Sequence, residues 1–178
     1  MVTARSARLR LERGNADYRA TGEFRGRVDA ERRKDLANGQ HPYAIVVSCS
    51  DSRVLPEAVF SASLGELFSI RVAGNVIGEH VLGSIQYAHE HLGCKLVVVL
   101  GHSNCGAVHA AFEGGATGYA GSLVSPIREL TCGCADERAA AIANARAGAA
   151  RVREAFPSAD LEVMPAFYDI ESGEVEWL

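Results

Sequence analysis

Two hydrophobic runs, each followed at once by a short polar motif, constrain this chain most. Residues 43–48 (YAIVVS) lead into residues 49–53 (CSDSR), and residues 95–100 (KLVVVL) lead into residues 101–106 (GHSNCG). Both runs are continuous and rich in β-branched side chains, which is typical of strands buried on both faces of a parallel sheet. In such sheets the loops after the carboxyl ends of the strands build the functional site. We therefore expect the two motifs to meet in space.

The residues that would meet there form a metal-ligand set. Cys49, His102 and Cys105 supply two thiolates and one imidazole, and three such ligands leave the fourth tetrahedral position of a zinc ion open, as in catalytic zinc sites. A lone cysteine at the end of a buried strand is ordinarily a small core residue. The charged residues Asp51 and Arg53, placed where a buried strand should simply stop, favour a functional site instead. We expect one Zn²⁺ per chain.

These motifs resemble those of the β-class carbonic anhydrases. The pair CSDSR and GHSNCGA is highly specific, and the likeness extends from about residue 15 to residue 177. Supporting stretches are GQHP at 39–42, LGELF at 64–68, RVAGN at 71–75, LGSIQYA at 82–88 and YDI at 168–170. The resemblance implies a zinc lyase, carbonate dehydratase, whose small-molecule substrates are carbon dioxide and bicarbonate and which releases a proton on hydration.

The resemblance also implies roles for residues around the metal. Asp51 would accept a hydrogen bond from the zinc-bound hydroxide, and the guanidinium of Arg53 would hold that carboxylate in a bidentate pair. In a closed state Asp51 would leave Arg53 and become a conditional fourth ligand. Gln40 is similar to the family's substrate-orienting glutamine, which is contributed across a dimer interface. The remaining predicted substrate-binding positions are Phe68, Ala73, Tyr87 and Gly106.

One branch of the family has an inhibitory bicarbonate pocket, enclosed by a tryptophan three residues before the first zinc cysteine. Here that position is Val46, so we expect no pocket of this kind. Arg71 occupies the position of that pocket's arginine, and without the aromatic wall we expect it to be a structural ion-pair partner.

Length and composition bound the fold. A chain of 178 residues, 48% of them hydrophobic, suffices for one domain with a substantial core. We expect an α/β domain with a mostly parallel central sheet flanked by helices over residues 39–178, preceded by a helical arm over residues 1–38. The formal charge of −4 and the mixed charges of the arm argue against nucleic acid as a partner. No apolar run matches a membrane span or an export signal, so we expect a cytoplasmic protein.

Hydrophobic runs and turn residues place the elements. Strands are expected at about 43–49, 67–72, 95–101 and 161–167, with a short edge strand near 174–177. Helices are expected up to residue 20 and over 27–38, 79–92, 104–112 and 136–155. Between residues 113 and 135 the glycines, Pro126 and the CGC turn predict connecting chain, shorter than the helical stretch usual in the family.

Three further cysteines, Cys94, Cys132 and Cys134, are expected to be free thiols, because one intervening residue strains a disulfide and an export signal is missing. The basic amino-terminal helices resemble the family's intersubunit clasp, which implies a homodimer or a higher even oligomer.

Three other functions stay open at this point: hydrolysis of a sulfur analogue such as carbon disulfide, a non-catalytic zinc-binding module, and a zinc-independent thiol redox protein. Asp51 and Arg53 favour an enzyme over the last two.

Overall fold

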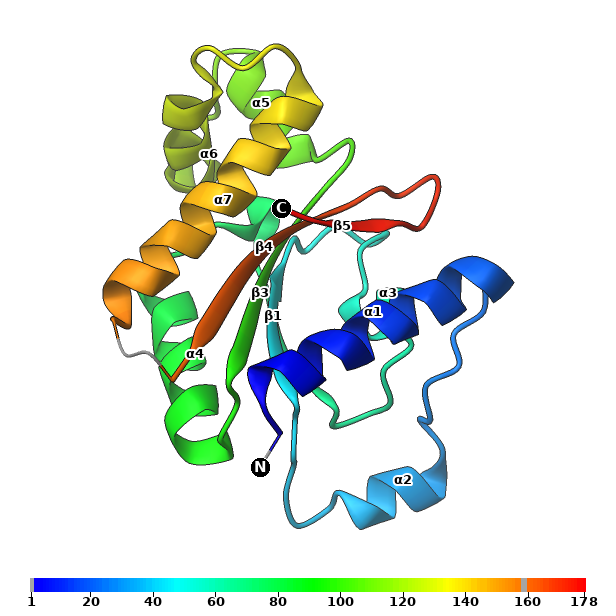
Figure 1. Ribbon diagram of the computed structural model, residues 1–178. Helices are drawn as coiled ribbons and strands as arrows, with labels where there is room; N and C mark the ends of the chain where they lie inside the picture. Colours follow the sequence, from blue (N-terminus) through cyan, green and yellow to red (C-terminus); the bar gives the residue numbers. More distant parts are fainter. Residues whose placement is uncertain (1, 158–159) are drawn as a thin grey trace.

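A computed structural model describes residues 2–157 and 160–178 of the chain. Five strands form one sheet in the order β2-β1-β3-β4-β5 (Figure 1). The strands are β1 (Ala44–Ser48), β2 (Leu67–Arg71), β3 (Leu96–His102), β4 (Glu162–Tyr168) and β5 (Val175–Trp177). The first four are parallel, and β5 runs antiparallel to β4 at one edge. The predicted α/β class and mostly parallel sheet are confirmed.

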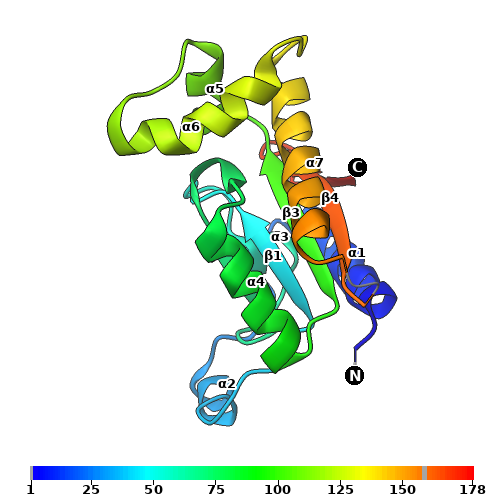
Figure 2. The same cartoon turned by 90° about the vertical axis from the view of Figure 1, so that its left-hand side faces the viewer.

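Helices cover both faces of this sheet (Figures 1 and 2). They are α1 (Ala4–Thr21), α2 (Ala30–Asp35), α3 (Pro56–Val59), α4 (Glu79–Leu92), α5 (Gly106–Phe112), α6 (Gly118–Thr131) and α7 (Glu137–Ala155), with a short 3₁₀ turn η1 (Ala73–Asn75). Successive residues of β1 point to opposite faces. Ile45 and Val47 pack with α4 and α7, whereas Ala44 and Val46 pack with α1 and α3. Burial on both faces explains why residues 44–47 of this strand are all apolar.

The amino-terminal helices are not a single extended arm. In α1, Ala7 and Leu11 are fully buried against the sheet, and the Asn15 amide donates to the carbonyl oxygens of Val59 (3.0 Å) and Gly173 (2.8 Å). By contrast, α2 buries no residue and lies apart from the sheet (Figure 1). The segment after α1 is therefore the less buried part of the predicted arm, and hydrogen bonds from Arg27 to Ser63 and from Arg32 to Leu64 tie it to its own chain.

The segment between α5 and α7 differs from the prediction, because it contains the 14-residue helix α6. Gly121 and Pro126 favour a break in a helix. However, Val124 and Ile127 on one side of α6 are buried in the core that α5 and α7 share. Packing of that apolar side outweighs the poor intrinsic propensity. The short helix α3 was also missed.

The order of the strands fixes where a site forms. The chain leaves β1 toward β2 on one side and leaves β3 toward β4 on the other, so the sheet has a switch point between β1 and β3. Cys49 directly follows β1, and His102 is the last residue of β3. Helices α5 and α6 stand beyond this end of the sheet (Figure 2). Within the described ranges, no helix is long and apolar enough to cross a membrane.

Candidate metal centre

Three ligand atoms converge at the switch point. One atom each from Cys49, His102 and Cys105 lies within 4.8 Å of the other two, and all three residues are buried. Cys49 follows β1, His102 ends β3, and Cys105 is the residue before α5. Among the described residues this is the one group of three or more such side chains close enough to hold a metal ion. The convergence expected from the two motifs is confirmed.

A hydrogen bond sets His102 in a tautomer that can bind a metal ion through Nε2. Its Nδ1 lies 2.9 Å from the carbonyl oxygen of Ser103, so Nδ1 carries the proton and donates it. That tautomer leaves a lone pair on Nε2, which is buried and has no hydrogen-bond partner among residues 2–157 and 160–178. A buried polar atom without a partner is costly, whereas a metal ion would satisfy it. Two sulfurs and one imidazole nitrogen fit zinc.

A hydrogen bond between the two sulfurs shifts the pKa values of Cys49 and Cys105 in opposite directions. The pKa of Cys49 is held below its usual range, chiefly because the Cys105 thiol donates to its sulfur. The same bond, together with burial, raises the pKa of Cys105. One proton is thus shared by the pair, and a metal ion bound there would displace it.

Asp51 and Arg53 form the predicted bidentate pair. Arg53 donates from Nε to Oδ1 (2.9 Å) and from Nη2 to Oδ2 (2.8 Å), and its backbone N–H also donates to Oδ1 (2.9 Å). These bonds keep the pKa of Asp51 well below its usual range. Arg53 is tied in turn to the second motif, through a bond from Nη2 to the carbonyl oxygen of Asn104 (3.1 Å). The carboxylate is therefore ionised and fixed beside the ligand Cys49.

Arg71 differs from the expected ion-pair partner. Its Nη2 donates to the carbonyl oxygen of Asp51 (2.8 Å) and its Nε to that of Cys49 (3.3 Å). Within the described part of the chain, Arg71 therefore braces the loop after β1 through backbone oxygens rather than pairing with a carboxylate. Val46 lies inside β1 and is fully buried.

The predicted substrate-binding residues fall into two groups. Ala73 and Gly106 lie at the metal centre: Ala73 opens η1, whose next residue, Gly74, donates its N–H to the Cys49 sulfur, and Gly106 follows Cys105.

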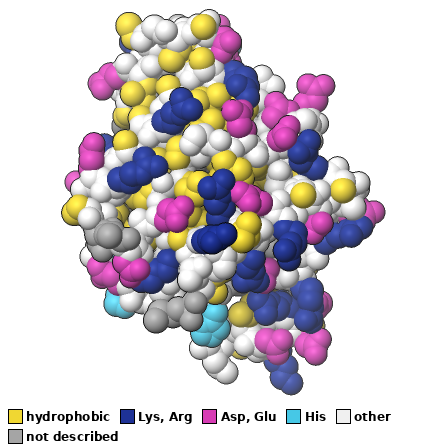
Figure 3. Space-filling view, viewed as in Figure 1, with side chains coloured by type: hydrophobic (Ala, Val, Ile, Leu, Met, Phe, Trp, Pro, Cys, Tyr) yellow, Lys and Arg dark blue, Asp and Glu magenta, His cyan; other side chains and the backbone are white. Residues whose placement is uncertain are grey.

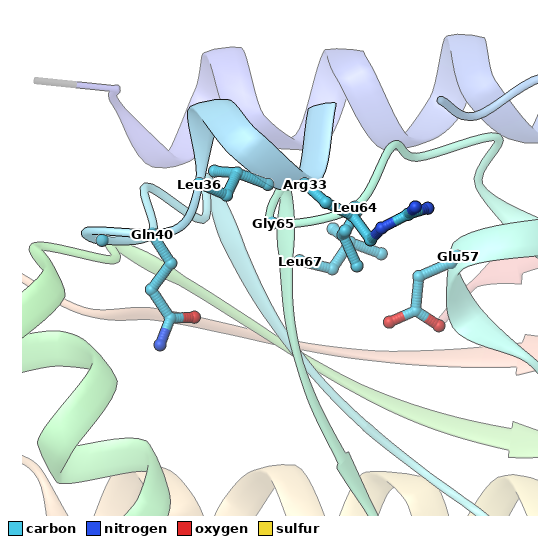
Figure 4. Close-up of a pocket in the computed structure, with 8 residues that line it drawn as sticks. Arg33, Leu36, Gln40, Glu57, Leu64, Gly65 and Leu67 are labelled. Carbon is cyan, nitrogen blue, oxygen red and sulfur yellow. The ribbon is translucent and has the colours of Figure 1, made fainter. Parts of the chain in front are cut away.

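Gln40, Phe68 and Tyr87 form the second group, at the other end of the sheet. Gln40 precedes β1 whereas Cys49 follows it, and a five-residue strand spans about 17 Å. Phe68 pairs with Ile45 near the start of β1, and its ring centroid lies 6.2 Å from that of Tyr87. Gln40 lines a pocket of about 550 Å³ that Arg33, Leu36, Glu57 and Leu67 also line (Figure 4). No metal ligand lines this pocket, so within one chain the second group does not join the metal centre.

The family resemblance expected from the motifs has independent support. A sequence profile of the carbonic anhydrase family matches residues 44–175, a range that contains all three ligand residues. The chain belongs to the β-carbonic anhydrase family. The β-carbonic anhydrase CafA of Aspergillus fumigatus superposes with a TM-score of 0.75 at 29% identity, over 83% of this chain and 80% of that protein. One of two tetrameric β-carbonic anhydrases of Sordaria macrospora superposes with a TM-score of 0.75 at 27% identity. The superposition covers 92% of this chain and 90% of that protein.

Among curated relatives of the family, carbonic anhydrase 2 of Mycobacterium tuberculosis is 46% identical over 101 residues, which are 57% of this chain and 49% of that protein. The chain spans about half the length of the curated relatives that it matches most strongly.

Proposed function

We propose that this protein is a zinc-dependent carbonic anhydrase that reversibly hydrates carbon dioxide to bicarbonate and a proton. The observation that carries the proposal is the Cys49, His102 and Cys105 set with the Asp51–Arg53 pair directly beside it. A ligand set alone would suit a structural metal site. A fixed, ionised carboxylate beside an open coordination position suits catalysis.

Cys49, His102 and Cys105 would hold the ion, and zinc supplies a nucleophile near neutral pH by lowering the pKa of water. The chain's own contribution is orientation. Arg53 donates to both oxygens of the Asp51 carboxylate, so the lone pairs of Asp51 that remain free could accept a hydrogen bond from a hydroxyl group at the centre. The same pairing would keep Asp51 from becoming a fourth ligand of the ion. For an uncharged substrate such as carbon dioxide, an apolar slot with one hydrogen-bond donor is sufficient for binding.

The second group of substrate residues supports a homodimer or a higher even oligomer. Gln40, Phe68 and Tyr87 lie at the wrong end of the sheet for their own metal centre, so we propose that they serve the centre of a second copy. Tyr87 is 48% exposed, and β2 is an edge strand with one side unpaired in the sheet, which leaves this region available for such a contact.

Charge supports the same contact. Residues 1–38 contain 10 Lys and Arg against 6 Asp and Glu, whereas the rest of the chain contains 8 against 16. Figure 3 shows many basic side chains over α1 and α2, with others over α7. Opposite net charges favour docking of this segment of one copy on the body of another. The free cysteines of the described chain suit the reducing cytoplasm, which we propose as its location.

A stopped-flow assay of carbon dioxide hydration, run beside metal analysis, tests the proposal. We expect one zinc per chain, hydration by the zinc-loaded protein, and loss of both in Cys105→Ser, because a hydroxyl is a much poorer ligand for zinc than a thiolate. Cys132→Ser and Cys134→Ser are matched controls that should keep both. Zinc held by Cys132 and Cys134 would contradict the proposed metal site. Hydrolysis of carbon disulfide without hydration of carbon dioxide would contradict the proposed substrate and favour the sulfur analogue instead.

A further inference from the structure

Asn144 is a buried polar residue in a helix that is otherwise rich in alanine. It lies in the middle of α7 and is only 5% exposed, with Ala141 and Ala145 beside it in the core. Asparagine is a poorer helix former than alanine, and burial of its amide is unfavourable without hydrogen bonds. The buried amide of Asn144 therefore needs a hydrogen-bond partner. Its Nδ2 donates to the carbonyl oxygen of Gly74, at 2.8 Å.

Gly74 in turn contacts the metal centre. Its backbone N–H donates to the Cys49 sulfur, with 3.2 Å between nitrogen and sulfur. The residue has φ +67°, a left-handed conformation that favours glycine. A Cβ at this position would lie 2.6 Å from Ile127 Cδ1 and 3.0 Å from the Ala107 Cβ, so α5 and α6 close one side of it. A residue with a side chain does not fit here.

The glycine brings backbone freedom to this position, and Asn144 limits that freedom. Glycine has more backbone freedom than any other residue, so an unheld Gly74 could turn its N–H away from the sulfur. The hydrogen bond from Asn144 on α7 fixes the carbonyl of Gly74, while Ile127 of α6 and Ala107 of α5 lie close to its Cα. Residues from three helices thus determine where a single N–H points.

We propose that Asn144 is a positioning residue of the metal centre: through Gly74 it holds an N–H donor on the Cys49 sulfur, and so tunes how this sulfur binds the metal. The inference rests on the metal centre proposed above. An N–H donor withdraws charge from a thiolate, and groups that hydrogen-bond to metal ligands shape both affinity and electronic structure. With two thiolates in the set, such a donor compensates part of their excess negative charge.

The test uses cobalt(II) in place of zinc, because cobalt thiolates absorb light in a sulfur-to-metal charge-transfer band. In Asn144→Ala we expect this band to move to longer wavelength, since the sulfur loses a charge-withdrawing partner. We also expect cobalt affinity, measured by competition with a chromophoric chelator, to fall about tenfold. Val152→Ala is the matched control: it truncates another fully buried residue of α7 that packs with β1 and β3, away from Gly74. It should lower stability but leave band and affinity unchanged.

An Asn144→Ala protein that binds cobalt with the wild-type band and affinity would overturn the inference alone. Failure of the wild-type protein to bind cobalt would overturn the metal centre itself and the inference with it. A second measurement needs no variant: in wild-type protein loaded with ¹¹³Cd, the amide proton of Gly74 should show scalar coupling to the metal through the N–H to sulfur bond. A cadmium-loaded protein without that coupling would overturn the first link, whether or not Asn144→Ala folds.

Discussion

At the scale of single residues, Arg53 explains how Asp51 can stand beside a metal ligand and stay available as an acceptor. Both carboxylate oxygens receive a guanidinium N–H, at 2.9 and 2.8 Å. Because Asp51 has a depressed pKa, it is a carboxylate throughout the neutral range. An amide in its place would turn an NH₂ group toward Arg53 and lose the bidentate pair.

Asp51→Asn should therefore keep one zinc per chain while the turnover of carbon dioxide hydration falls by about a hundredfold or more. Stopped-flow kinetics and metal analysis on the same preparation check this. Turnover at the wild-type level in a zinc-loaded Asp51→Asn protein would remove Asp51 from the mechanism.

His109, on α5, gives a test of the charges around the site that does not involve the metal. Its Nδ1 lies 2.7 Å from a Glu137 oxygen and its Nε2 lies 3.5 Å from one of Glu113. The Glu137 bond first, and the charges of both carboxylates next, raise the pKa of His109 above 6.5. Folding therefore favours the protonated ring. The stabilisation is complete below the unfolded pKa and is lost as the pH rises through the folded pKa, and it is small because the pair is exposed.

An NMR titration should place the His109 midpoint above 6.5 in the wild-type protein, and Glu137→Gln should lower it toward that value. A wild-type midpoint at or below 6.5 would show that the ion pair does not form in solution.

The cluster of Cys49, His102 and Cys105 was predictable because each lies at or just after the end of an apolar strand and stands out by its residue type. Asn144 and Gly74 were missed. Their role depends on hydrogen bonds between segments 70 residues apart, which no local pattern reveals. An asparagine within an alanine-rich helix was the available signal. The partners of Arg71 were missed for the same reason, since a guanidinium can also donate to backbone carbonyl oxygens that only the fold brings near.

At the scale of elements, hydrophobic runs located the five described strands, most clearly β1 and β3, because strands buried on both faces are largely apolar. Helix α6 escaped the same reasoning: its stability comes from Val124 and Ile127 in a shared core, while its glycines and Pro126 point the other way. The packing partner of α1 could not be predicted either, because amphipathic spacing does not show whether a helix packs on its own chain or on a second copy. In the structure it covers its own sheet.

The contact of α1 with α3 gives a prediction of stability. A Cβ on Gly14 would lie 1.8 Å from the carbonyl oxygen of Phe60, so Gly14→Ala must push the helix off the core. We expect a loss of about 1–3 kcal/mol in the free energy of unfolding, despite the better helix propensity of alanine.

Urea denaturation at fixed protein concentration measures the effect of Gly14→Ala. Asp17→Ala, on the exposed side of the same helix, is the control and should change the free energy of unfolding by less than about 0.5 kcal/mol. Equal stability of Gly14→Ala and wild type would show that α1 does not pack on α3 in solution.

At the scale of the whole molecule, the predicted substrate-binding residues divide between the two ends of β1, and this division could not be read from one chain's sequence pattern. If Gln40 serves a neighbouring copy, two defective variants should complement each other. Gln40→Ala lacks the donated amide, and Cys105→Ser lacks the metal. A mixed dimer restores one complete site from two different chains.

After subunit exchange in an equal mixture, about a quarter of the sites should be intact, so hydration should rise well above the sum of the separate variants. Stopped-flow activity before and after mixing measures this, and mass spectrometry of the intact assembly confirms exchange. Mixed assemblies without recovered activity would place Gln40 outside the neighbour's site.

If Cys49, His102 and Cys105 hold the zinc that hydrates carbon dioxide, a zinc titration of the metal-free protein should show it. Carbon dioxide hydration, followed by stopped flow as zinc is added, should rise linearly and level off at one zinc per chain, while Cys105→Ser stays inactive at the same zinc concentrations. Hydration that does not respond to zinc, or that saturates equally in Cys105→Ser, would contradict the claim.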